Sequence, residues 1–224
     1  MNIDIENLTF AWREEPVFKN VSISLESGDI VLLSGENGSG KTTLLKLMCG
    51  MIPHFSRGKS LHGDISINSI SIITEPPKFF FPNIAFIPNY NLDFFLLNQN
   101  LEEELLIIQA LMKLSTVQIY NKISRFKSYF HEYQHEPRLP FSDMSVQQKI
   151  MALSLVYYIQ GASIYLIDEI FTQFTRTTFY HKWKFFLTEL SHSGCSIIYI
   201  SHNMSGIENK VWNINNKTIN CTIC

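Results

Sequence analysis

A glycine-rich segment followed by lysine and threonine is the strongest chemical signal in this sequence. Residues 35–42 read GENGSGKT, which matches the pattern G-x-x-x-x-G-K-[ST]. An apolar run, IVLL, precedes the segment, and a leucine-rich stretch that predicts a helix follows it. In that setting, glycines let backbone N–H groups curve around phosphate oxygens, Lys41 places a cation between the β- and γ-phosphates, and the Thr42 hydroxyl can ligate Mg²⁺. The segment therefore predicts a phosphate-binding loop.

Two acids follow an apolar strand pattern much later in the chain. Residues 164–169 read IYLIDE, so Asp168 and Glu169 come directly after a predicted buried strand. Asp168 would hold Mg²⁺, usually through water, and Glu169 would orient and polarise the attacking water. By itself the pattern also describes a strand that ends in surface acids. Together with the phosphate-binding loop it predicts a site for hydrolysis.

A histidine follows the next predicted strand. Residues 197–202 read IIYISH, which puts His202 at the carboxyl end of an apolar run. Ligands of open α/β sheets gather at this edge, so we expect His202 near the two acids. Its neutral ring could hydrogen-bond the γ-phosphate.

The elements around these residues predict an α/β fold. Alternating apolar residues in 3–12 and 21–25 indicate two half-buried antiparallel strands. A helical stripe runs over 101–112, started by Asn100 with Glu103 in the capping-box position, and polar helical sequence continues to about His135. Helix and strand patterns then alternate, which implies parallel strands joined by crossover helices. These later segments are 145–160 (helix), 163–167 (strand), 176–191 (helix) and 196–201 (strand).

Composition and length narrow the class of protein. The chain has 224 residues, 46% of them hydrophobic and 17% charged, which favours one globular domain and argues against a disordered or fibrous chain. A formal charge of -2 gives no net basic field, so nucleic acid is disfavoured as a partner. The N-terminus lacks a signal-peptide pattern, which predicts a cytosolic protein. The charge-free run 150–167 is interpreted as a buried helix and strand, since Gln160 and Gly161 interrupt it.

The order and spacing of these motifs resemble the ATP-binding subunits of ABC transporters over nearly the whole chain. The resemblance implies a P-loop NTPase (RecA-like) core with a mixed sheet, an antiparallel β edge subdomain and a helical subdomain near 95–160, all within one nucleotide-binding domain over 1–224. It also implies ATP and Mg²⁺ as cofactors. An integral membrane transporter subunit and a second ABC ATPase subunit would be the partners, on the cytoplasmic face of the membrane.

The resemblance also assigns roles to residues. Trp12 would stack on adenine, although a place in the core explains this residue too, and Lys41, Glu169 and His202 would be catalytic. Thr42, Asp168 and Asn89 would hold the metal. The complete set of implied nucleotide contacts is Trp12, Gly35, Glu36, Asn37, Gly38, Ser39, Gly40, Lys41, Thr42, Thr43, Asn89, Ser145 and Gln148.

Four departures from the family pattern involve five residues. Asn89 replaces a glutamine, Ile170 replaces a proline and Thr175 replaces an aspartate. In the signature segment, Val146 and Gln147 replace two glycines, which puts side chains where the family brings bare backbone against the partner's nucleotide. These departures favour a heterodimer with a better-preserved ATPase, or else a catalytically weak subunit. Ser145 and Gln148 match the signature, but S-x-x-Q is also an ordinary capping box.

Other features leave alternatives open. Segments near 50–68 and 92–105 resemble energy-coupling-factor ATPases for vitamin and metal uptake, whereas DEIFTQFT also resembles cytochrome c biogenesis ATPases. The aromatic clusters 79–81 and 94–95 are candidates for docking to the membrane partner or for core packing. The pentamer HEYQH, with His131, Glu132 and His135, matches H-E-x-x-H and offers a remote alternative, a zinc hydrolase.

Overall fold

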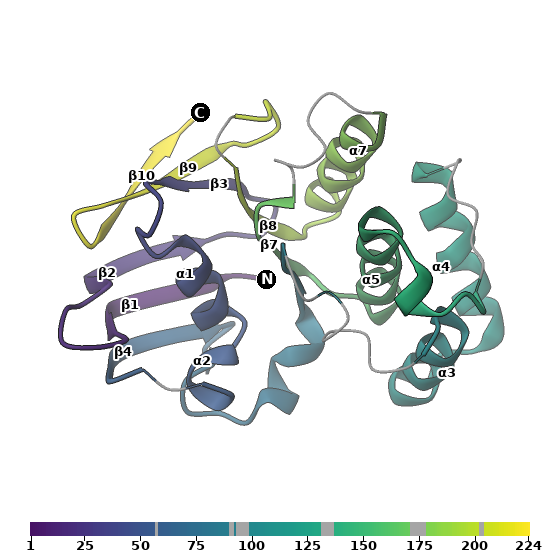
Figure 1. The fold of residues 1–224 in the computed structure, drawn as a ribbon, viewed down its shortest axis with the longest axis horizontal. Helices are drawn as coiled ribbons and strands as arrows, with labels where there is room; N and C mark the ends of the chain where they lie inside the picture. The colour runs from purple at the N-terminus through teal and green to yellow at the C-terminus, as the bar shows by residue number, and fades with distance from the viewer. Residues whose placement is uncertain (57, 90–91, 93–98, 131–136, 171–177, 202–203) are drawn as a thin grey trace. The chain divides into compact units, whose positions relative to one another are not determined.

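The computed structural model describes residues 1–224 apart from 57, 90–91, 93–98, 131–136, 171–177 and 202–203 (Figure 1). The chain forms two compact units. The first consists of Met1–Phe86 and Ser163–Cys224, and the second of Ile87–Ala162. The first unit carries the phosphate-binding segment and the two acids, and the second is built mainly of helices.

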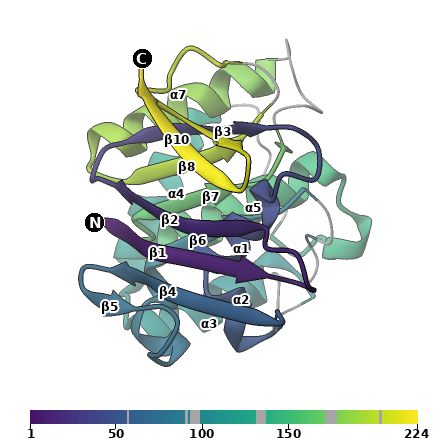
Figure 2. The ribbon, with the colours of Figure 1, turned by 90° about the vertical axis from the view of Figure 1, so that its left-hand side faces the viewer.

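An antiparallel sheet opens the first unit, with the strand order β2-β1-β4-β5. Figure 2 shows β2, β1 and β4 side by side. The two predicted N-terminal strands are confirmed, because alternate residues of β1 such as Ile3 and Ile5 are buried. The strands are β1 (Ile3–Ala11), β2 (Phe18–Leu25), β4 (Ser60–Ile67) and β5 (Ile70–Ser71).

The second sheet is mixed, as predicted, and has the order β10-β9-β3-β8-β7-β6. β3 pairs in parallel with both β8 and β9, and β8 pairs in parallel with β7. Every residue of β7 and β8 is buried, as expected of parallel strands covered on both faces. The strands are β3 (Ile30–Gly35), β6 (Ile84–Ile87), β7 (Ile164–Ile167), β8 (Ser196–Ile200), β9 (Lys210–Asn215) and β10 (Thr218–Ile223).

The β9–β10 hairpin lies outside the elements that the sequence patterns predicted. The two strands pair antiparallel through a turn in which Asn216 and Lys217 have φ values of 49° and 66°. Two consecutive residues of positive φ match the twist of a tight hairpin. The sequence feature that could have predicted this hairpin is therefore an asparagine-rich turn between two short alternating segments.

The described part of the first unit contains two longer helices. α1 (Lys41–Met48) begins after Gly40 and ends before Gly50, whose left-handed φ of 74° terminates the helix. α7 (Thr178–His192) buries Trp183, Phe186 and Leu187. Shorter helical segments are α2 (Met51–His54), η1 (Pro77–Phe79) and η2 (Phe81–Asn83).

The second unit contains α3 (Leu101–Met112), α4 (Thr116–Tyr129), η4 (Phe141–Asp143) and α5 (Val146–Gln160). Asn100 caps α3 by accepting a hydrogen bond from the Glu103 N–H, as predicted. The polar sequence that follows forms a separate helix, because Lys113 turns left-handed and Ser115 starts α4 with its own capping box. Residues 150–167 form the predicted buried helix and strand, α5 and β7. Within the described ranges, no helix combines the length and the apolar character needed to cross a membrane.

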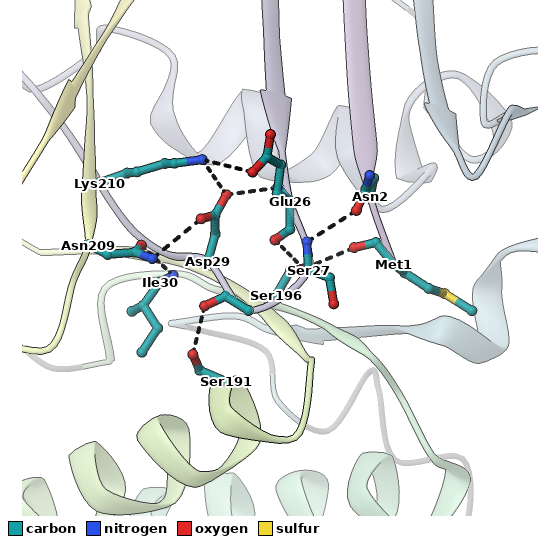
Figure 3. Close-up of polar contacts among 11 residues, drawn as sticks. Met1, Asn2, Glu26, Ser27, Asp29, Ile30, Ser191, Ser196, Asn209 and Lys210 are labelled. Atoms are coloured by element: carbon teal, nitrogen blue, oxygen red, sulfur yellow. Dashed lines mark hydrogen bonds and ion pairs between the residues drawn. The ribbon is translucent and has the colours of Figure 1, made fainter.

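A polar network joins the starts of the core strands (Figure 3). The Asp29 carboxylate, 5% exposed, accepts hydrogen bonds from Glu26 N and Lys210 Nζ, both at 2.8 Å, and from Asn209 Nδ2 at 3.4 Å. Asn209 Oδ1 in turn accepts the Ile30 N–H at 2.9 Å. The network thus connects the turn before β3 to the beginning of β9.

A second part of this network involves the first residues of the chain. Ser196 Oγ lies within hydrogen-bond distance of the carbonyls of Met1 (3.0 Å) and Glu26 (2.9 Å), and Ser27 N donates to Asn2 Oδ1 at 3.1 Å. These contacts tie β1 and β2 of the first sheet to β8 of the second. The edge of the core opposite the carboxyl ends of the strands is therefore well satisfied in hydrogen bonds.

We predict that Asp29→Ala lowers the free energy of unfolding by about 1–3 kcal/mol, because it leaves the Glu26 N–H and the Lys210 ammonium without their acceptor. The measurement is the midpoint of urea unfolding. Glu15→Ala is the control, since its ion pair with Lys217 is solvent-exposed and should leave the midpoint unchanged. Equal midpoints for the wild type, Asp29→Ala and Glu15→Ala would show that the Asp29 network contributes nothing to stability.

Candidate functional site

The phosphate-binding loop lies between β3 and α1, as predicted, and its glycines are required by close contacts. Gly35 has a φ of 144°, and a Cβ there would lie 2.8 Å from the Ile214 carbonyl oxygen and from Ser39 Oγ. Gly40 has a φ of 106°, and its Cβ would lie 2.5 Å from Val17. Larger residues at either position would have to displace the loop. The loop is therefore fixed between β9 on one side and the beginning of β2 on the other.

Polar groups in this loop fit a phosphate ligand. Lys41 is 7% exposed, and its ammonium donates to the carbonyls of Gly35 at 2.9 Å and Glu36 at 3.0 Å. Ser39 Oγ is buried and has no hydrogen-bond partner among the described residues. Buried hydroxyls are rarely left unpaired, so this oxygen needs a ligand to complete its hydrogen bonding. A phosphate oxygen would accept from Ser39 and from Lys41.

Thr42 and Asp168 come together, as the motifs predicted. The Thr42 hydroxyl lies 3.1 Å from both carboxylate oxygens of Asp168, which is 0% exposed. Burial raises the pKa of Asp168 to about 6, the Thr42 hydrogen bond opposes this rise, and the charge of Glu169 adds to it. A hydroxyl oxygen beside a buried carboxylate is a donor set that Mg²⁺ accepts. The described geometry therefore fits the predicted metal position.

Glu169 follows directly and adopts an unusual backbone conformation. Its φ is 53°, in the left-handed region that non-glycine residues seldom occupy. Such strain of about 1–3 kcal/mol persists where surrounding structure imposes it, and it concentrates at functional sites. This observation agrees with the role predicted for Glu169.

Trp12 lies at the same loop. Its indole Nε1 donates to Thr43 Oγ1 at 3.3 Å, and its ring meets Phe10 edge-on with centroids 4.9 Å apart. The side chain is 40% exposed, whereas Phe10 is fully buried. Phe10 is thus the core residue, and Trp12 presents an accessible aromatic surface next to the first turn of α1.

Some predicted site residues belong to the second unit. Asn89 Oδ1 is buried and lacks a hydrogen-bond partner among the described residues, which makes it available to a ligand. Ser145 and Gln148 form the capping box of α5, with Ser145 N donating to Gln148 Oε1 at 2.8 Å and Gln148 N donating to Ser145 Oγ at 3.3 Å. The local alternative for these two residues is confirmed, and their contact with nucleotide stays a prediction.

Several predicted residues lie outside the described residues. They are His202, Thr175, the aromatic pair 94–95 and the H-E-x-x-H residues His131, Glu132 and His135. Of the other aromatic cluster, Phe79 and Phe81 are exposed, while Phe80 is buried beside the His54 ring. Core packing therefore accounts for Phe80, and Phe79 and Phe81 are left as candidates for docking.

Sequence patterns missed three supports of the site. They are the β9 residue Ile214 behind Gly35, the hairpin residue Val17 against Gly40, and the hydrogen bond from Trp12 to Thr43. The alternation around Ile214 was visible in the sequence. The other two contacts join segments with no local pattern that pairs them.

Comparisons with known proteins point to one family. A family model described as ABC transporter matches residues 18–172, more than half of the chain. The chain is 26% identical over 207 residues to the energy-coupling factor transporter ATP-binding protein EcfA1 of Fusobacterium nucleatum, covering 92% of this chain and 75% of that protein. It is also 44% identical over 68 residues to the cytochrome c biogenesis ATP-binding export protein CcmA of Reclinomonas americana, covering 30% of this chain and 28% of that protein.

Solved structures show the same fold. The structure of an ATP-binding subunit of an ABC transporter superposes with a TM-score of 0.82 at 19% identity, over 100% of this chain and 90% of that one. An ATP-binding cassette in a dimeric post-hydrolysis state, bound to ADP and Pi, gives 0.78 at 15% identity, over 99% of this chain and 98% of that one. From the phosphate-binding loop, the acids beside it and the family match, we conclude that this chain belongs to the ABC transporter family.

Proposed function

We propose that this chain binds and hydrolyses MgATP and couples hydrolysis to transport by a separate integral membrane subunit. The observation that carries the proposal is the loop in which the buried Ser39 hydroxyl lacks a partner among the described residues, with Lys41 in the same loop and the Thr42–Asp168 pair next to it. The match to EcfA1 over most of the chain favours the energy-coupling-factor branch, which takes up vitamins and metal ions. The match to CcmA covers a smaller share of the chain, so the cytochrome c biogenesis branch has weaker support.

Each residue would contribute a separate part of the chemistry. Lys41 would leave the loop carbonyls and donate to the β- and γ-phosphates, and the orphan Ser39 hydroxyl would take another phosphate oxygen. Thr42, Asp168 and Asn89 would hold Mg²⁺, which neutralises phosphate charge when bound. Glu169 would accept a hydrogen bond from water and orient it toward the γ-phosphate, and His202 would hydrogen-bond the same phosphate.

The organisation of the protein follows from this function. We infer one nucleotide-binding domain over 1–224 with its helical subdomain near 95–160, supported by the α3, α4 and α5 helices. The protein would lie on the cytoplasmic face of the membrane beside its transporter subunit. Phe79 and Phe81 are exposed aromatic residues of the first unit and are the candidates for that contact.

Lys41→Ala should weaken MgATP binding by about 10- to 100-fold, the loss expected for hydrogen bonds to a charged group. Isothermal titration calorimetry measures the affinity. Lys127→Ala is the matched control, because Lys127 is an exposed lysine in the last turn of α4 and is not among the predicted nucleotide contacts. An unchanged affinity in Lys41→Ala would contradict the proposed phosphate site.

A pH dependence follows from the buried carboxyl. In the folded protein the pKa of Asp168 is about 6, above its ordinary value of 3.8. This carboxyl therefore destabilises the free fold once it is charged above pH about 6, and that cost is absent below pH about 4. Mg²⁺ binds the charged form, so Mg²⁺ must compete with a proton at lower pH.

We therefore expect the Mg²⁺ affinity of the ATP complex to fall by up to about tenfold per pH unit below pH 6 and to level off above pH 7. Magnesium titrations at several pH values measure it. Asp168→Asn removes the carboxyl, so the pH dependence left in this variant comes from titration of the nucleotide itself. That remaining dependence can be subtracted from the wild-type profile. A profile identical in wild type and Asp168→Asn would remove Asp168 from the metal site.

We further propose that the working complex is a heterodimer with a second, better-preserved ATPase. Val146 is 49% exposed at the first position of α5, and the exposed Gln147 follows it. These side chains stand where the family signature has glycines. The phosphate-binding loop of this chain, with Asp168 and Glu169, would then form a complete site with the intact signature segment of the partner. The partner's own site would face Val146 and Gln147.

In the assembled complex, Glu169→Gln should lower ATP turnover by about 10²- to 10⁴-fold, because the neutral amide cannot polarise water. Val146→Gly with Gln147→Gly should instead raise turnover at the other site. Glu189→Gln on α7 is the control, because Glu189 is a half-buried residue outside the predicted site, and it should leave turnover unchanged. Two copies of this chain with symmetric turnover would overturn the heterodimer, and absent turnover in the wild-type complex would identify a catalytically weak subunit.

A further inference from the structure

The hydrogen bond from Trp12 to Thr43 links the predicted base-stacking residue to the helix turn that follows the phosphate-binding loop. Trp12 follows β1 in the antiparallel sheet, and Thr43 lies in the first turn of α1, 31 positions later in the chain. The indole Nε1–H is the only polar group of the Trp12 side chain, and it donates to Thr43 Oγ1 at 3.3 Å. The ring that would stack on a base is therefore held by the helix that follows the phosphate loop.

The Trp12 ring is restrained from a second direction. The buried Phe10 ring meets it edge-on, at an interplanar angle of 86° and a centroid distance of 4.9 Å. Phe10 is itself held, because a Cβ on Gly58 would lie 2.5 Å from its ring. The neighbouring Ala11 carbonyl accepts the Lys59 N–H at 2.8 Å. With one polar and one aromatic contact, Trp12 has a defined orientation while 40% of it stays exposed.

The Thr43 hydroxyl is left with its proton to donate. A hydroxyl has one donor and two acceptor lone pairs, and an indole N–H can only donate, so Trp12 occupies an acceptor position. Among the described residues, no acceptor is found for the Thr43 hydroxyl proton. Thr43 directly follows Lys41 and Thr42, in the turn whose backbone N–H groups favour anions. A phosphate oxygen is the acceptor that this position fits.

We propose that Trp12, Thr43 and a nucleotide phosphate form a hydrogen-bond relay, in which Thr43 is the positioning residue for the Trp12 ring. The indole N–H donates to the Thr43 hydroxyl, and that hydroxyl donates to phosphate. Each bond polarises the next, so phosphate binding strengthens the hold on the ring, and the ring orients the hydroxyl toward phosphate. Trp12 would thus contribute to phosphate binding even when no base is present. The relay rests on the proposed nucleotide site.

Inorganic tripolyphosphate is the probe that separates the relay from simple base stacking, since it has no base. Trp12→Phe keeps an aromatic ring and loses the donor. If Trp12 acts only by stacking, this variant binds tripolyphosphate as wild type does. The relay predicts an affinity about two- to fivefold weaker for Trp12→Phe, and no further loss when Trp12→Phe is added to Thr43→Val. Thr43→Ser retains the hydroxyl and should restore the tripolyphosphate affinity that Thr43→Val loses.

Indole fluorescence gives a second readout on the same full-length proteins. The chain has three tryptophans, and Trp183 and Trp212 are fully buried, so acrylamide quenching reports mainly on Trp12. Tripolyphosphate should reduce quenching in wild type and Thr43→Ser, and should leave it unchanged in Thr43→Val. This response distinguishes positioning of the ring from a general change in stability.

The outcomes separate the relay from the proposed function. Unchanged tripolyphosphate affinity in Trp12→Phe, or additive losses in the double variant, would overturn the relay while ATP binding by wild type still supports the nucleotide site. Failure of wild type to bind either ATP or tripolyphosphate would overturn both. A weaker affinity in Trp12→Phe with no additional loss in the double variant would establish the relay.

Discussion

The parallel pairing of β3 with β8, and of β8 with β7, is the constraint on which the site depends. Ile30 to Leu33 align with Ile197 to Ile200, and Ile167 of β7 aligns with Tyr199. Parallel strands end at the same edge of a sheet, so this register places the loop after β3 beside the acids after β7. The Thr42–Asp168 contact is the direct result, although 126 positions separate the two residues.

The two ends of this core have opposite physical character. At the amino ends of the strands, Asp29, Lys210, Asn209 and Ser196 satisfy one another and the neighbouring backbone. At the carboxyl ends, Asp168 is buried with a raised pKa and Ser39 lacks a partner in the described part of the chain. Glu169 adds a strained backbone there. Unsatisfied groups cost stability, so a fold that keeps them needs a well-bonded opposite edge and a ligand that completes them.

Local patterns in the sequence determined the parts of the protein that depend on neighbours along the chain. Glycines with Lys41 and Thr42 define a phosphate loop because its donors lie within one short segment. The caps of α3 and α5 could be predicted for the same reason, since Asn100 and Ser145 bond residues three positions away. Continuous apolar runs identified β7 and β8, because a strand buried on both faces needs no polar alternation.

The tertiary structure decided what depends on distant segments. It placed β9 behind Gly35 and the β2 hairpin against Gly40, and it gave Trp12 an exposed place bonded to Thr43. It also divided the predicted helical continuation at Lys113, whose left-handed conformation ends α3 before Ser115 starts α4. Such contacts leave no periodic signal, because each side chain meets a partner from another element. The sequence by itself determined which chemistry the loop offers. The tertiary structure decided how two distant residues lie relative to that loop, because contacts with Phe10 and Thr43 hold Trp12 and the parallel strand register places Asp168.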